Sequence, residues 1–271
     1  MVAQPTWPNL YRRGMSEPHA AVWDEGANDA ALEHRLRAWA IPAALLGSFV
    51  VVHTSLGRAL VRIFFSMWVH EIGHAAAAWL CGYLAFPGPW LTPIAAERSP
   101  LFAVLVASAL AFAVVRNWSA DRRGFAGSLA ALLVLQLGCA TLLQPDSARQ
   151  LIVFAGDGGC LVLGTLLMTS LYAPEETSLR RGWLRWGFLA IGSASFADVF
   201  AQWWSARRDE DAIPFGHNEG AGLSDPSVLT ETFGWGTSTL VHRYVALGCV
   251  CLVALAAVYA FGLWQSATDR E

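Results

Sequence analysis

The stretch FSMWVHEIGHAAAAWLCG, residues 65–82, places two histidines and a glutamate inside an apolar run that is typical of a membrane helix. Helix positions four residues apart differ by about 40° in direction and about 6 Å in rise, so His70 and His74 share a face. Two imidazoles at this spacing can bind one zinc ion, and a catalytic zinc needs a third protein ligand and an open position for water. Glu71 lies beside His70, where it can accept a proton from zinc-bound water. The pattern therefore predicts zinc-dependent hydrolysis.

The apolar setting of this motif strengthens the prediction. A single charged group in a membrane helix costs about 2.5–3.5 kcal/mol, and ionisable residues there are functional by default. The alternative is a noncatalytic role, in which these three residues form a polar cluster that joins helices. A di-iron enzyme such as a lipid desaturase needs several histidine pairs, whereas the other histidines here are isolated. They are His19, His34, His53, His217 and His242.

The composition is that of a membrane protein, with 55% hydrophobic and only 14% charged residues among 271. Apolar stretches close to the roughly 20 residues that cross a bilayer recur along the chain. We expect seven spans, at 38–56, 60–84, 100–116, 125–143, 150–172, 183–204 and 240–264. The predicted fold is an all-α, multi-pass membrane bundle, located in a bacterial cell membrane.

The polar segments set the expected domain boundaries. Residues 1–37 form a polar N-terminal tail, 38–264 the bundle and 265–271 a C-terminal tail. Within the bundle, residues 205–239 are too polar to span a membrane and too long for an ordinary turn. A short helix is expected in this loop, beginning at Ser224 or Asp225 with a proline in its first turn.

Charge and cysteine content exclude other classes of protein. The net charge is −3 and no basic block occurs, so nucleic acid is not expected as a partner. All five cysteines lie in or beside apolar runs, so no disulfide framework is implied. Arginines are equally divided between the two expected sides of the membrane, which leaves the orientation open.

The third zinc ligand is expected in the fifth span, in LIVFAGDGGCLVLG at residues 151–164. Asp157 is the one acidic residue of that span, and the glycines around it let another backbone approach closely. A structural hydrogen bond is the alternative role for Asp157. Asp198 in the sixth span is a less favoured ligand, and it can equally orient a ligating histidine or join two helices. Glu97 and Glu219 are further alternatives in polar connectors.

With HEIGH at 70–74 and DGG at 157–159, the chain resembles the site-2 protease family of intramembrane zinc metalloproteases. The resemblance covers little more than the second to fifth spans. Gly156 stands where the family usually has a leucine, and two spans rather than one separate the motifs. The chain has no room for the PDZ or CBS domain that the family often carries.

The resemblance implies a role for each matching residue. His70, His74 and Asp157 are similar to the zinc ligands, and Glu71 is similar to the general base. The implied activity is cleavage of a membrane protein, with a single span, in or near the lipid bilayer. A noncatalytic subunit or a pseudoprotease that only binds is the alternative function, but the intact base favours an enzyme. The proline-rich FPGPWLTPI at 86–94 is expected to be a gating or re-entrant element.

Overall fold

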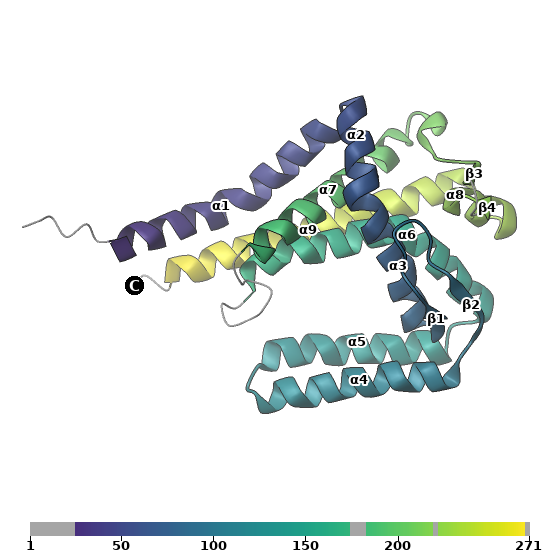
Figure 1. The fold of residues 1–271 in the computed structure, drawn as a ribbon, viewed down its shortest axis with the longest axis horizontal. Coiled ribbons are helices and arrows are strands. Elements are labelled where there is room, and N and C mark those ends of the chain that lie inside the picture. The colour runs from purple at the N-terminus through teal and green to yellow at the C-terminus, as the bar shows by residue number, and fades with distance from the viewer. Residues whose placement is uncertain (1–24, 174–182, 219–221, 269–271) are drawn as a thin grey trace, which may run out of the picture.

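The computed structural model describes residues 25–173, 183–218 and 222–268, and this part of the chain is mostly helical (Figure 1). Each of the seven apolar stretches lies mostly in helices. The α-helices are α1 (Glu25–Val52), α2 (Ser55–Val61), α3 (Met67–Leu80), α4 (Pro100–Ser119), α5 (Arg123–Thr141), α6 (Pro145–Thr169), α7 (Leu184–Ser205), α8 (Asp225–Ser227) and α9 (Thr237–Thr268). Two π-helices, η1 (Arg62–Ser66) and η5 (Val228–Thr232), and two 3-10 helices, η2 (Ser170–Tyr172) and η4 (Glu210–Ala212), join them.

Four helices in the described part of the chain are long and apolar enough to cross a membrane, namely α4, α5, α6 and α9. A fifth span is added if α1 and the α2–α3 segment, which meet at 116°, count as one bent pair. This is the pattern of a multi-pass membrane protein, with four or five spans where seven were expected. Helix α7, with 22 residues, is long enough to cross a membrane, but its sequence is less apolar than those of α4, α5, α6 and α9.

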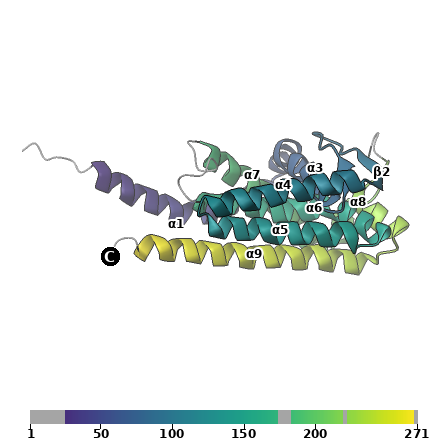
Figure 2. The same ribbon diagram turned by 90° about the horizontal axis from the view of Figure 1, so that it is seen from below.

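The ends of the described chain differ from the expected boundaries. Helix α1 begins at Glu25, so the described part of the predicted polar tail is helical. At the other end, α9 continues to Thr268. Residues 1–24 and 269–271 lie outside the described residues. The start of α1 and the end of α9 lie at the same end of the molecule (Figure 2), and the Tyr259 hydroxyl donates to the Ala38 carbonyl at 2.8 Å.

Helices α3, α6, α7 and α9 form the buried centre, and α6 packs against the other three. The crossing of α3 and α6 is close enough to require glycine on both helices. A Cβ atom at Gly73 would lie 2.2 Å from the Ala155 carbonyl oxygen, and one at Gly159 would lie 2.5 Å from Gly73 Cα. This confirms the prediction that the glycines around Asp157 allow another backbone to approach.

Helices α4 and α5 form a hairpin that meets the rest of the molecule mainly at α3 and β1 (Figure 1). No residue of α4 is buried, and its apolar side chains face outward. A helix that is apolar all round suits a lipid environment. Gln136 of α5 is fully buried, and its amide donates to the Ala103 carbonyl of α4 at 3.2 Å.

Two small antiparallel hairpins flank the central helices. Strands β1 (Tyr83–Ala85) and β2 (Ile94–Arg98) carry the proline-rich segment between them, and the Thr92 hydroxyl donates to the Glu71 carbonyl at 2.9 Å. The segment predicted to gate the site is therefore the tip of a hairpin held against α3. Strands β3 (His217–Asn218) and β4 (Gly222–Leu223) form the second hairpin, within the long polar loop.

The long polar loop folds back onto α6. The predicted short helix is present as α8, with Ser224 before it and Pro226 in its first turn. The Gly216 amide donates to Ser227 Oγ at 2.9 Å, and the indole N–H of Trp235 donates to Gln150 Oε1 of α6 at 2.9 Å. Leu229 of η5, which is part of the loop, is fully buried. These contacts hold the N-terminus of α8 over the central helices.

Candidate metal centre

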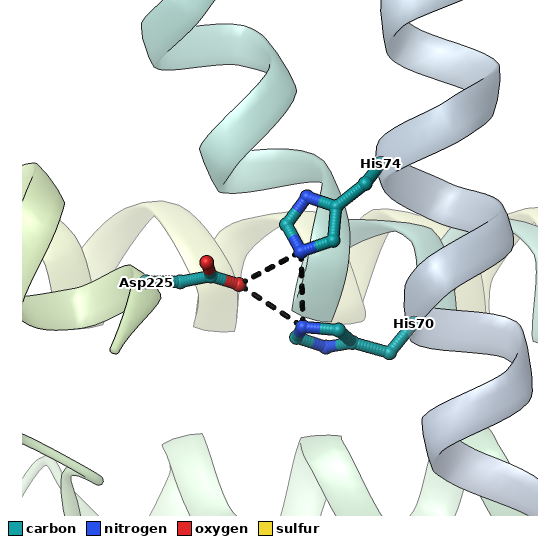
Figure 3. Close-up of side chains that lie close together, drawn as sticks. All are labelled: His70, His74 and Asp225. Carbon is teal, nitrogen blue, oxygen red and sulfur yellow. Dashed lines mark hydrogen bonds and ion pairs between the residues drawn. The ribbon is translucent and has the colours of Figure 1, made fainter. Parts of the chain in front are cut away.

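Three side chains from two distant parts of the sequence converge on one point (Figure 3). His70 Nε2 and His74 Nε2 are 3.1 Å apart, and Asp225 Oδ2 lies 3.0 Å from the first and 3.1 Å from the second. Tetrahedral zinc with bonds of about 2.0–2.1 Å spaces its ligand atoms by about 3.3 Å. The triangle therefore has nearly the size of one face of a zinc coordination shell.

The hydrogen bonds on the far side of each ring assign the tautomers. His70 Nδ1 lies 3.1 Å from Asp157 Oδ1, and His74 Nδ1 lies 2.8 Å from the Ile152 carbonyl oxygen. Both partners are acceptors, so each Nδ1 carries the proton and each Nε2 presents a lone pair. When both rings are neutral, Asp225 Oδ2 is a third acceptor and is buried without a hydrogen-bond donor. Three converging acceptors repel one another unless a proton or a metal cation lies among them.

The surroundings of Asp225 favour the ionised form of its carboxyl group. Burial raises its pKa, but when the two imidazoles are protonated, the charge of His74 and the hydrogen bonds that His70 and His74 donate lower it further than burial raises it. The net result is a pKa well below the usual range of an aspartate. The donor set of two imidazoles and one carboxylate suits zinc or another divalent transition metal.

Asp157, the predicted third ligand, reaches the site from a different side. Its Oδ1 contacts His70 Nδ1, on the edge of the ring that faces away from the converging atoms, and its Oδ2 accepts the indole N–H of Trp203 at 2.8 Å. It is buried, with 5% of its surface exposed. Histidines that bind metals commonly donate their other ring nitrogen to a carboxylate, which fixes the orientation of the ring. This geometry suits Asp157 to holding His70 in place.

Asp198, the alternative ligand, is not near the histidines' converging atoms but pairs with Arg62. Its Oδ2 lies 2.9 Å from Arg62 Nε, and Gln202 of the same helix also accepts from the guanidinium. Asp198 therefore joins α7 to the π-helix that precedes α3, one of the roles left open for it. Of the other candidates, Glu97 is exposed and Glu219 lies outside the described residues.

Asp225 is a candidate ligand that was not predicted from the sequence. Its place at the start of a helix in an unusually long polar loop was a signal that the loop has structure. Nothing in the spacing relates position 225 to positions 70 and 74. The tertiary fold brings them together, because the loop is anchored on α6 and α6 crosses α3 at the histidines.

The candidate metal centre requires a glycine at position 156 of α6. A Cβ atom there would lie 2.6 Å from His70 Nε2 and 2.7 Å from Asp225 Oδ2. Both atoms belong to the converging group, so any larger side chain would displace them. The GDGG run thus makes three contributions: Gly156 leaves space for the ligand atoms, Asp157 contacts His70, and Gly159 allows the close crossing with α3.

A cavity of about 460 Å³ opens beside the three converging atoms. Glu71 is buried and lines this cavity together with the candidate ligands. The proline-rich hairpin and the long loop both contribute apolar side chains to its lining; these residues are Trp90, Leu91, Ile94, Pro214, Leu223 and Pro226. A carboxylate, a candidate metal centre and an apolar chamber therefore share one space.

No protein-family model, no curated protein and no solved structure matches this chain. The resemblance to site-2 proteases accordingly rests on the two sequence motifs.

Proposed function

We propose that the protein is an intramembrane zinc metalloprotease that hydrolyses a peptide bond of a membrane protein. The supporting observation is the triangle of His70 Nε2, His74 Nε2 and Asp225 Oδ2, with sides of 3.0–3.1 Å, beside the buried Glu71. These three residues would hold the zinc ion. Bound zinc would supply hydroxide at neutral pH, because it lowers the pKa of its water to about 7.

The residues of the chain perform the remaining tasks. Glu71 accepts the proton of the attacking water and passes it to the leaving amine. Asp157 and the Ile152 carbonyl hold the two imidazole rings with their lone pairs toward the ligand position. The apolar walls of the cavity limit the access of bulk water, which strengthens the electrostatic interactions within it.

The substrate class follows from the setting of the site. The candidate ligands lie on or against helices of membrane-spanning length, so a substrate that spans the same bilayer can reach them. We further propose that α7 crosses the bilayer inside the bundle, because its 22 residues extend about 33 Å. The chain would then cross the bilayer five or six times, because α7 is added to the four or five spans already described. A substrate helix must unwind before cleavage, since its amides are closed by internal hydrogen bonds.

The decisive experiment compares the metal content and the activity of one variant. Purified protein should hold about one zinc per chain, and Glu71→Gln should retain that zinc while cleavage of single-span substrates falls at least 100-fold. Elemental analysis and a peptide-release assay measure the two quantities. Undiminished cleavage by Glu71→Gln would contradict the proposal. Zinc binding without any cleavage would favour the noncatalytic alternative.

A further inference from the structure

A second cavity adjoins the cavity beside the candidate metal centre (the metal cavity), and two arginines line it. It has a volume of about 560 Å³ and lies among α2, η1, the end of α7 and the start of the long loop. Its polar lining residues are Ser55, Arg58, Arg62, Gln202, Ser205 and Asp211. Arg62 and Pro214 line both cavities, so the two spaces share a wall.

The two arginines of this polar cavity are four residues apart, on one face of the helix that leads into α3. Arg62 is paired with Asp198 and Gln202 of α7. The side chain of Arg58 donates from Nε to the Val52 carbonyl at 3.0 Å, and no ion pair involves it among the described residues. Asp211 lines the cavity without an ion pair to either arginine within the same part of the chain. The guanidinium of Arg58 is therefore available to an anion.

We infer that the polar cavity receives an acidic side chain of the peptide substrate whose scissile bond lies at the metal centre. This inference rests on the proposed function. A guanidinium pairs with a carboxylate through two parallel hydrogen bonds, which gives both affinity and geometric selection. The neighbouring metal cavity has mostly apolar walls and takes apolar residues, so the two cavities together select an apolar segment followed or preceded by an acid.

The distance between the acid and the scissile bond can be calculated from the helix. Residues 55–80 form one helical path through α2, η1 and α3, in which Arg62 and Arg58 precede His70 by eight and twelve residues. At about 1.5 Å per residue these positions are about 12 and 18 Å along the helix from His70. An extended peptide advances about 3.3 Å per residue. The acidic residue is therefore expected four to six residues from the scissile bond.

Peptide binding to the full chain carrying Glu71→Gln tests the inference without cleavage. The protein is placed in nanodiscs of zwitterionic lipid, and fluorescent apolar peptides carry one glutamate that moves along the sequence. Matched peptides carry glutamine or lysine at the same place. Anisotropy should show that the glutamate peptide binds about fivefold more tightly than the glutamine peptide at the favoured position.

Charge reversal identifies the residue responsible. Arg58→Glu in the same background should reverse the preference, so that the lysine peptide binds best. Arg116→Glu on α4, whose side chain lines neither cavity, is the matched control and should keep the preference for glutamate. Equal binding of all three peptides by the chain with Arg58 intact would overturn the inference.

Two further outcomes separate the competing explanations. If phosphatidylglycerol in the nanodisc abolishes the preference for glutamate, the cavity holds a lipid phosphate and the assignment to substrate is overturned. If zinc-loaded chain with Glu71 intact prefers the glutamate peptide but cleaves none, the proposed protease function fails while the acid-binding cavity is supported. The two failures are thus distinguishable.

Discussion

The crossing of α3 and α6 and the hairpin of α4 and α5 are both pairs of apolar helices, but they use their residues in opposite ways. At the crossing, glycines bring two backbones together and the polar side chains point inward to the candidate metal centre. In the hairpin, large apolar side chains face outward and Gln136 is the buried polar group between the helices. The two helix pairs have similar average hydrophobicity. The positions of their small and polar residues therefore distinguish the pair that carries the candidate site from the pair that faces outward.

Matched glycine substitutions should show this difference most strongly. Gly159→Ala places a Cβ atom 2.5 Å from Gly73 Cα, a backbone atom that cannot move aside, and we expect a loss of about 3 kcal/mol in unfolding free energy. Gly127→Ala on α5 meets no atom within 4 Å and should be neutral or slightly stabilising, because alanine favours helix by up to about 1 kcal/mol. Denaturant unfolding in detergent measures both. Equal effects would mean that the two helix pairs do not differ as described.

Substitution of the two carboxylates at the crossing should rank their roles. Asp225→Asn removes the charge of a candidate ligand and should weaken zinc binding by more than 100-fold, whereas Asp157→Asn removes the negative charge beside the candidate ligand His70 and should weaken it by about 10- to 100-fold. Competition with a chelator measures both affinities.

Gln136→Leu in the hairpin is the control for loss of a buried polar group, and it should leave zinc affinity unchanged. The opposite ranking, with Asp157→Asn the more severe, would identify Asp157 as the ligand and Asp225 as its support.

The smallest expected effect comes from Trp203, which donates to Asp157 Oδ2 at 2.8 Å and stacks on Tyr244 with ring centroids 4.2 Å apart. Trp203→Phe retains a ring for stacking but loses the N–H donor, so zinc affinity should fall about threefold. Trp204→Phe, the next residue on the same helix, should have no effect. A loss of thermal stability without a change in zinc affinity would limit Trp203 to packing.

Much of the helical framework and half of the site could be predicted from local sequence. The apolar stretches predicted the helices, because a backbone in lipid must satisfy its hydrogen bonds within each segment. The spacing of His70 and His74 placed both rings on one face, because helical geometry depends only on neighbouring residues. The number of crossings was less predictable: the bend of 116° between the α1 and α2–α3 segments and the modest apolarity of α7 reduced seven expected spans to four or five.

The sequence alone therefore determined an apolar helix with two imidazoles and an adjacent glutamate, and a glycine-rich partner helix. The tertiary structure alone decided which carboxylate faces the two Nε2 atoms. Asp157 and Asp225 are both close to His70, but Asp157 lies at Nδ1 and Asp225 at Nε2. No sequence pattern indicates which of the two ring nitrogens a carboxylate contacts. The position of Asp225 depends on how a long loop folds back onto α6, and that is determined by packing and hydrogen bonds between residues far apart in the chain.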